Sequence, residues 1–353
     1  MRMNFIIILA KPSRSLTEAM DPLAIVCFFT LLPLCLTAVA PTVTLMNAAK
    51  PGTKMPVSGI GTGGYNRRPG VGPGEVWNDT VSEKAIKTWL AVGGLRIDGA
   101  IEYGDQIGVG NAIKESGIPR KDIFMTSKVT FIGYNETFTQ LNKILSELQM
   151  DYVDLLLIHW PGNPPDNTTD PACQGNPSTW RSCRQSIWKA LEEIFKNGTA
   201  LAIGVSNLEK NQLEDILMMK SMVPSVNQVE YHPYWHEDEL VEYCKQNNIL
   251  FNSYAPLGRP DGAPIIRGWN GTILDLPVIQ NIANTHQRSA AQILQRWQWQ
   301  QGIVVNPRSM NQDHMKENLN FFDFELSKDE MKQISSITPP SDPKVCPDPR
   351  SIK

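Results

Sequence analysis

The sequence predicts an α/β protein of the (β/α)8 TIM-barrel class, and two observations predict it. Eight short runs of apolar or β-branched residues recur along the chain, from about residue 57 to residue 307. Amphipathic stretches of helical period separate these runs. Strands that alternate with helices pair in parallel, and eight such units favour a closed barrel over an open doubly wound sheet.

The expected elements follow one another in regular alternation. Several helical stretches end in glycine or asparagine, as at Gly117 and Gly198, where a left-handed cap is favoured. Strands are expected at residues 57–62, 95–98, 123–128, 152–159, 201–206, 225–231, 250–254 and 303–307. Helices between them include residues 83–91, 138–148, 186–197 and 238–247.

Length and composition fit one large domain. The chain has 353 residues, of which 41% are hydrophobic and 20% charged, enough for a barrel core with an added extension. The formal net charge is −3, so no basic excess points to a nucleic-acid partner. We expect an N-terminal extension at residues 1–54, the barrel at residues 55–340 and a C-terminal tail at residues 341–353.

The N-terminal extension carries an apolar run at residues 22–40. This run is long enough for a transmembrane helix, or for the apolar core of a secretory signal. Lys11 and Arg14 precede it, and their positive charge favours translocation of the C-terminal domain. The small residues ending at Ala40 fit a cleavage site, although Pro41 would hinder cleavage. The alternative is a buried helix or a wrong start.

Sequons and cysteines bear on the same question. The chain has five Asn-x-Thr sequons, where its composition gives roughly three by chance. Cys173 and Cys183 flank a polar, proline-rich loop and can pair if that loop faces an oxidising lumen. We therefore expect a glycoprotein of the secretory pathway. It would be lumenal, extracellular or anchored in the membrane through residues 22–40. The alternative is a cytoplasmic protein. The sequons begin at Asn78, Asn135, Asn167, Asn197 and Asn270.

Four reactive side chains mark the ends of successive expected strands. Asp98, Lys128 and His159 each stand where a strand ends, and Tyr103 lies in the loop after the second strand. Active residues of such barrels gather at the C-terminal ends of the strands. Taken alone, each residue also has a purely structural reading. Asp98 fits a helix cap, Tyr103 an aromatic packing residue and His159 a hydrogen-bonded histidine of the core. Together they indicate a catalytic set. No cysteine spacing resembles a zinc site, so no metal is expected.

These residues lie in motifs that resemble the aldo-keto reductase family. The resemblance runs from about residue 55 to about residue 338, in family order. The matching motifs are GLRIDGAIEYG (94–104), MTSK (125–128), LIHWP (157–161), GVSN (204–207), NQVEYHP (227–233), SYAPLG (253–258), PRS (307–309) and EN (317–318).

The resemblance implies a reductase that converts aldehydes or ketones to alcohols with NADPH. It assigns Asp98, Tyr103, Lys128 and His159 as the catalytic tetrad, with His159 and Trp160 at the substrate. It also implies that Ser206, Asn207 and Gln228 hold the nicotinamide carboxamide and that Tyr254 stacks on the ring. The rest of the implied cofactor path is Leu257, Arg308, Ser309, His314, Glu317 and Asn318.

The expected chemistry divides hydride and proton between cofactor and protein. The cofactor supplies the hydride, and Tyr103 donates the proton to the carbonyl oxygen. Lys128 is expected to lower the pKa of Tyr103, and Asp98 to keep Lys128 charged and oriented. His159 is expected to donate a hydrogen bond that fixes the carbonyl oxygen.

Three positions depart from the family pattern. Gly99 replaces the usual threonine, which is expected to loosen the support of the tetrad. Gly63 replaces a bulky aromatic residue, which predicts a wider mouth. His314 replaces the usual arginine at the 2′-phosphate, so NADH stays open beside NADPH.

The main alternative is a non-catalytic or regulatory cofactor-binding subunit with the same fold. A glycoside hydrolase is disfavoured, because the strand ends do not offer two opposed carboxylates. We expect a monomer that acts on a small-molecule carbonyl substrate, whose identity the long loop at residues 162–181 does not reveal.

Overall fold

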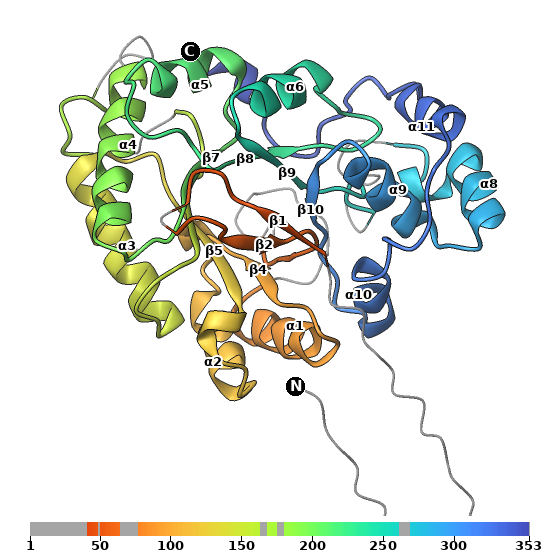
Figure 1. The fold of residues 1–353 in the computed structure, drawn as a ribbon, viewed down its shortest axis with the longest axis horizontal. Helices are drawn as coiled ribbons and strands as arrows, with labels where there is room; N and C mark the ends of the chain where they lie inside the picture. The colour runs from red at the N-terminus through yellow and green to blue at the C-terminus, as the bar shows by residue number, and fades with distance from the viewer. Residues whose placement is uncertain are drawn as a thin grey trace, which may run out of the picture. The chain divides into compact units, whose positions relative to one another are not determined.

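Eight parallel strands form one sheet in the order β10-β9-β8-β7-β6-β5-β4-β3 (Figure 1). The structure is a computed structural model, and it describes residues 41–48, 50–63, 77–162, 168–174, 180–260 and 269–352. The strands are β3 (Ile60–Gly61), β4 (Arg96–Asp98), β5 (Phe124–Val129), β6 (Leu155–Ile158), β7 (Ile203–Ser206), β8 (Val226–Glu230), β9 (Leu250–Tyr254) and β10 (Val304–Asn306). Each overlaps one of the eight expected strands.

The sheet closes on itself between its first and last strands. Ser58, just before β3, forms a parallel bridge with Val305 of β10. The Val305 amide donates to the Val57 carbonyl over 3.0 Å, and the Gly61 amide donates to the Pro307 carbonyl over 3.0 Å. A sheet whose ends pair in this way is a barrel, so the predicted (β/α)8 class is confirmed.

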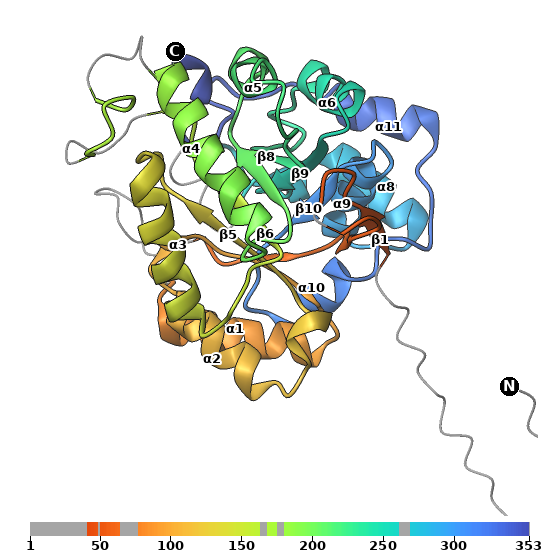
Figure 2. The same cartoon turned by 60° about the vertical axis from the view of Figure 1, so that its left-hand side comes forward.

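Helices cover the outer face of the barrel (Figures 1 and 2). The strands are buried almost throughout, as expected where helices pack on one face and side chains fill the interior. The helices are α1 (Asp79–Ala91), α2 (Gln106–Glu115), α3 (Tyr134–Leu148), α4 (Trp180–Lys196), α5 (Lys210–Leu217), α6 (Asp238–Gln246), α8 (Pro277–His286), α9 (Ala290–Trp299), α10 (Gln312–Asn318) and α11 (Lys328–Ser335). Short 3-10 turns are η1 (Ile101–Tyr103), η2 (Arg120–Asp122), η4 (Ile273–Asp275) and η5 (Pro349–Ser351).

Helix ends follow the expected chemistry, but three helices begin earlier than expected, α1 and α3 by four residues and α4 by six. Gly117 and Gly198 have φ values of +69° and +78°, the left-handed region in which glycine carries no steric penalty. Helix α4 begins at Trp180, six residues before its expected start at residue 186. Its first turns already bury Cys183 and Ile187, at the spacing of an amphipathic helix.

A β-hairpin spans residue 55, the position at which we expect the barrel domain to begin. Strand β1 (Thr42–Thr44) pairs antiparallel with β2 (Lys54–Pro56), so this hairpin crosses the expected boundary. Leu45 and Met55 are buried in a cluster with Phe124 and Leu155, the first residues of β5 and β6. The hairpin therefore covers the N-terminal end of the barrel.

The C-terminal tail is tied to the opposite end of the barrel. Glu230, the last residue of β8, accepts hydrogen bonds from the Val345 amide at 2.6 Å and the Cys346 amide at 3.0 Å. Farther along, the Gln212 side chain donates to the Ile352 carbonyl over 2.7 Å. Residues 341–352 thus contribute to the wall around the strand ends.

Cys173 and Cys183 form a disulfide that joins the loop after β6 to helix α4. Both cysteines are fully buried. Among the helices in the described ranges, none is long and apolar enough to span a bilayer. The apolar run at residues 22–40 lies outside the described residues.

Candidate active site

The four predicted catalytic residues come together at the C-terminal end of the barrel. Asp98 ends β4, Lys128 is the next-to-last residue of β5, and His159 directly follows β6. Tyr103 ends the 3-10 turn η1 after β4. Because parallel strands end at the same side of the sheet, side chains distant in sequence meet here.

Lys128 lies at the centre of the set and is fully buried. Its Nζ donates to Asp98 Oδ1 at 2.5 Å and to the Gly99 carbonyl at 2.9 Å. The same Nζ lies 3.4 Å from the hydroxyl of Tyr103. A buried ammonium needs such partners, and this one directs a donor toward the phenol.

The phenol of Tyr103 is buried in a way that favours its protonated form. Burial raises the pKa of Tyr103 well above its usual value, and the Asp98 carboxylate raises it further. The lowering of this pKa by Lys128 that the sequence suggests stays a prediction. A protonated phenol is the form that can act as an acid.

His159 faces Tyr103 on one side and a carboxylate on the other. Its Nε2 lies 3.5 Å from the Tyr103 hydroxyl, and the two rings meet edge to face with centroids 5.5 Å apart. Glu102 Oε2 lies 2.5 Å from His159 Nδ1. Burial lowers the pKa of His159, and Glu102 acts in the opposite direction. Sequence reasoning did not single out Glu102.

Polar residues at the ends of β7, β8 and β9 lie beside the tetrad. Gln228 donates from Nε2 to Asp98 Oδ2 at 2.6 Å. Asn207 donates from Nδ2 to the His159 carbonyl at 2.9 Å and accepts from the Tyr254 hydroxyl at 2.7 Å. Asn207 has φ +62°, a left-handed backbone that asparagine tolerates well and that often occurs at functional sites.

Ser206 completes this group. Its hydroxyl donates to the Gln228 carbonyl at 2.8 Å and receives a hydrogen bond from Asn207 Nδ2 at 3.2 Å. The group offers side-chain amides and a hydroxyl next to the half-buried ring of Tyr254. This donor and acceptor set fits a carboxamide beside a flat ring.

The remaining predicted cofactor residues have different surroundings. Arg308 donates to the Gly63 carbonyl at 2.6 Å and lies over the Trp77 ring, 5.1 Å from its centroid. His314 is exposed on α10, whereas Asn318 is buried and accepts from Gln295 at 2.8 Å. Half-buried members of the set are Leu257, Ser309 and Glu317.

The two departing glycines, Gly63 and Gly99, both lie near the four candidate catalytic residues. A Cβ atom at Gly63 would lie 2.9 Å from Cζ of Tyr103, closer than side chains tolerate. Gly63 thus leaves room for the phenol ring, which differs from the simple widening of the mouth predicted from sequence. At Gly99 an added Cβ would approach the Met125 side chain to 3.3 Å. Trp160 is half-buried beside His159, with ring centroids 6.0 Å apart.

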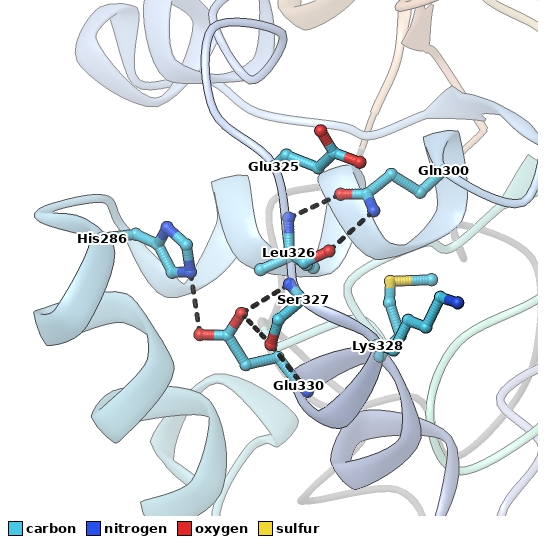
Figure 3. Close-up of a pocket in the computed structure, with 8 residues that line it drawn as sticks. His286, Gln300, Glu325, Leu326, Ser327, Lys328 and Glu330 are labelled. Carbon is cyan, nitrogen blue, oxygen red and sulfur yellow. Dashed lines mark hydrogen bonds and ion pairs between the residues drawn. The ribbon is translucent and has the colours of Figure 1, made fainter.

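A separate hollow of about 650 Å³ lies between α8, α9 and α11 (Figure 3). Gln300 lines it at the end of α9, which leads into the start of β10, the opposite end of the strands from the tetrad. Its polar groups serve the fold: Glu330 forms a capping box with Ser327 and accepts from His286 at 2.8 Å. This hollow brings no reactive set together.

Fold and site define a parallel β/α-barrel oxidoreductase with a Lys-Asp pair beside a phenol and an imidazole. The family model described as "Aldo/keto reductase family" matches residues 59–339, and the chain belongs to this family. Carbonyl and alcohol groups are the groups on which this family acts, which agrees with the prediction from sequence.

Individual relatives cover most of the chain. It is 37% identical over 285 residues to "Glyoxal reductase" of Bacillus subtilis, covering 80% of this chain and 92% of the relative. It is 36% identical over 303 residues to "Aldo-keto reductase family 1 member A1" of Cricetulus griseus, covering 81% and 87%. A crystal structure of an aldo/keto reductase from Brucella melitensis aligns with TM-score 0.69 and 31% identity, covering 84% and 97%.

Proposed function

We propose that this protein reduces aldehydes or ketones to alcohols, with Tyr103 as the proton donor. The observation that carries the proposal is the position of the Tyr103 hydroxyl, 3.4 Å from Lys128 Nζ and 3.5 Å from His159 Nε2. An acid between an ammonium and an imidazole suits protonation of an oxygen that gains negative charge.

The proposed cofactor is NADPH, with NADH as the alternative. When bound, it supplies the hydride that the carbonyl carbon receives. Ser206, Asn207 and Gln228 would hold the carboxamide, and Tyr254 would lie against the ring. Arg308 would serve the phosphates as a permanent cation, whereas the exposed His314 offers less charge at neutral pH.

Each tetrad residue has one task in this proposal. Tyr103 transfers its proton to the carbonyl oxygen. Lys128 stabilises the resulting phenolate, and Asp98 keeps Lys128 oriented through the 2.5 Å contact. His159 places the carbonyl oxygen within reach of the phenol.

The decisive variant is Tyr103→Phe, which removes the acid and keeps the ring. We expect kcat for aldehyde reduction to fall by about 10²–10⁴-fold, the usual contribution of a positioned acid. The Kd for NADPH, followed by fluorescence, should stay within a few-fold. The matched control is Tyr152→Phe, which lies before β6 at the other end of the strand and should keep full activity. Undiminished activity of Tyr103→Phe would refute the proposed role.

The substrate panel should include small aldehydes, ketones and the dicarbonyl glyoxal, which the name of the Bacillus relative suggests. Cofactor-resolved rates with NADPH and NADH measured side by side would decide the preference. Binding of NADPH without turnover of any carbonyl would favour the regulatory cofactor-binding subunit instead.

We further propose that the protein folds in an oxidising compartment of the secretory pathway, with the cytoplasm as the alternative. Two features support this proposal. The buried Cys173–Cys183 disulfide needs oxidising conditions to form and persist. In addition, the asparagines of the four sequons within the described ranges are all exposed, at Asn78, Asn135, Asn197 and Asn270. The fifth sequon, at Asn167, lies outside those ranges.

A further inference from the structure

The segment that directly follows β6 carries His159 and Trp160, and two buried side chains hold its backbone. Asn207 donates from Nδ2 to the His159 carbonyl over 2.9 Å. Two residues farther along, Arg184 donates from Nη1 to the Pro161 carbonyl over 2.6 Å. Trp160 lies between these two hydrogen bonds. Both side chains that the proposed function places at the substrate therefore belong to a backbone that is held on either side.

Arg184 is a buried cation that one carboxylate orients. The residue is 3% exposed and lies in the second turn of α4. Its Nε and Nη2 donate to Asp215 Oδ2 of α5 over 3.0 Å and 2.7 Å. Helices α4 and α5 lie side by side (Figures 1 and 2), so the pair joins two neighbouring helices. Because the guanidinium is planar and rigid, these two bonds fix the direction in which Nη1 points.

The ion pair alone does not explain this arrangement. Replacing a buried ion pair by apolar side chains is often neutral for stability, because the cost of removing two charges from water offsets their attraction. Apolar side chains cannot, however, supply a donor for the Pro161 carbonyl. The chain also passes close to the start of α4 here: a Cβ atom at Gly162 would lie 2.5 Å from Cε3 of Trp180. The loop after β6 thus rests on α4, and Arg184 binds it there.

We infer that Arg184 is a positioning residue that holds the loop after β6 in the geometry that carbonyl reduction needs. Asp215 orients Arg184, and Arg184 fixes the Pro161 carbonyl. His159 and Trp160 then face the substrate from a backbone that keeps one position. This inference rests on the proposed reductase function. A displacement of about 1 Å at a catalytic group can lower a rate by about 10²-fold, so a residue outside the tetrad can control the reaction in this way.

The first test removes the two charges together. In the double variant Arg184→Met, Asp215→Leu neither charge is left buried without its partner, so we expect the barrel to fold. Its kcat/KM for an aldehyde should fall by about tenfold to about 10²-fold, with kcat lowered and KM raised, while the Kd for NADPH stays within a few-fold. A pair that only stabilised the fold would alter the urea midpoint and leave kcat and KM unchanged. That result would overturn the inference.

Arg181 provides a matched control on the same carboxylate. Its Nε lies 3.2 Å from Asp215 Oδ1, but its side chain is 52% exposed. Arg181→Met should therefore keep the wild-type kcat and KM. The single variant Arg184→Met is a second route to the expected loss, because Asp215 keeps its contact with Arg181. An equal loss in Arg181→Met would contradict the inference, since it would trace the effect to the surroundings of Asp215 and not to the bond with Pro161.

The second test does not depend on turnover. Hydrogen exchange at the amides of Trp160 and Gly162, measured on the full-length chain, should become about tenfold faster in the double variant, whereas exchange in β10, on the opposite side of the barrel, should not change. Unchanged exchange at both amides would overturn the inference, and so would equal acceleration in β10, because it would show a general loss of stability. A chain that reduces no carbonyl, but whose two amides exchange faster in the double variant, would count against the proposed function. The role of Arg184 in holding the loop would then stand.

Discussion

Asp105 shows how one buried carboxyl can make stability depend on pH. It is fully buried just before α2, where the Ser82 hydroxyl donates to its Oδ2 at 2.6 Å. Burial raises the pKa of Asp105 from 3.8 to about 6, and the neighbouring Asp79 adds to the rise. The folded chain therefore holds this proton more tightly than the unfolded chain does. Stability is highest while Asp105 is protonated, and it falls as pH rises from about 4 to about 6.

We expect Asp105→Asn to stabilise the protein at alkaline pH. A shift from 3.8 to about 6 corresponds to about 3 kcal/mol of unfolding free energy that the variant should recover at pH 8, and almost none of it at pH 4. Urea unfolding at both pH values measures the difference. The exposed Asp151→Asn should leave stability unchanged at both. Equal destabilisation of Asp105→Asn at pH 4 and pH 8 would contradict this expectation.

Sequence predicts the four candidate catalytic residues but not their closest neighbours. Asp98, Lys128 and His159 could be found because each ends a strand, and strand ends follow from hydrophobic patterning. Glu102 gives no such signal, because a glutamate in a loop looks the same whether it faces water or an imidazole. The burial of Tyr103, which raises its pKa, is likewise not visible in the sequence, because it depends on the residues packed around the phenol.

At the scale of elements, the loop between β6 and α4 is held by a covalent link. The Cys173–Cys183 disulfide spans 10 residues of sequence and fixes the described part of this loop to the first turns of α4. Asp170 lies in the same segment and accepts hydrogen bonds from the Tyr134 amide at 2.9 Å and the Ser186 hydroxyl at 2.6 Å. The loop therefore has both covalent and polar attachments to α3 and α4.

Loss of the disulfide should cost about 3 kcal/mol of unfolding free energy, the chain-entropy value for a loop of this size. The double variant Cys173→Ala, Cys183→Ala keeps both buried positions apolar and isolates this effect. Reductant should lower the urea midpoint of the wild-type chain and leave that of the double variant unchanged. Equal midpoints of the oxidised wild-type chain and the double variant would show that the link adds nothing to stability.

Element boundaries were less predictable than element types. All eight strands were found from sequence, whereas α4 began six residues early and the β1–β2 hairpin was not expected. Each strand of that hairpin has only three residues, too few to display an alternating pattern. It is stable because Leu45 and Met55 are buried against the barrel, a contact that local sequence does not reveal.

For the whole molecule, the compartment is the property with the widest consequences. Attachment of a glycan requires an accessible asparagine, and Asn78, Asn135, Asn197 and Asn270 are exposed. Asn78 also caps α1 by accepting the Val81 amide at 3.0 Å through Oδ1, which leaves Nδ2 for attachment. The four asparagines lie in different parts of the barrel, so the expected glycosylation does not depend on the structure of a single loop.

We expect the full-length chain, produced in cells with a secretory pathway, to lose mass on treatment with a glycosidase specific for asparagine-linked glycans. Substitution of each sequon asparagine by glutamine should remove one increment of that shift where a glycan is attached. Protein made in bacteria, which lacks these glycans, is the control. No mass shift, combined with ready alkylation of Cys173 and Cys183 without reductant, would place the protein in the cytoplasm.

The hairpin at residues 42–56 covers one end of the barrel and leaves the other uncovered, so the two ends tolerate amino-acid substitutions differently. At the covered end, Leu45 and Met55 meet the first residues of several strands, so substitutions there alter stability first. At the other end, loops surround the proposed tetrad, and loops in this position shape the binding site of such barrels. Evolution can therefore alter these loops and acquire new carbonyl substrates while the reaction and the fold persist. Because the covered end supports the fold, the same barrel can carry binding sites for different substrates at its other end.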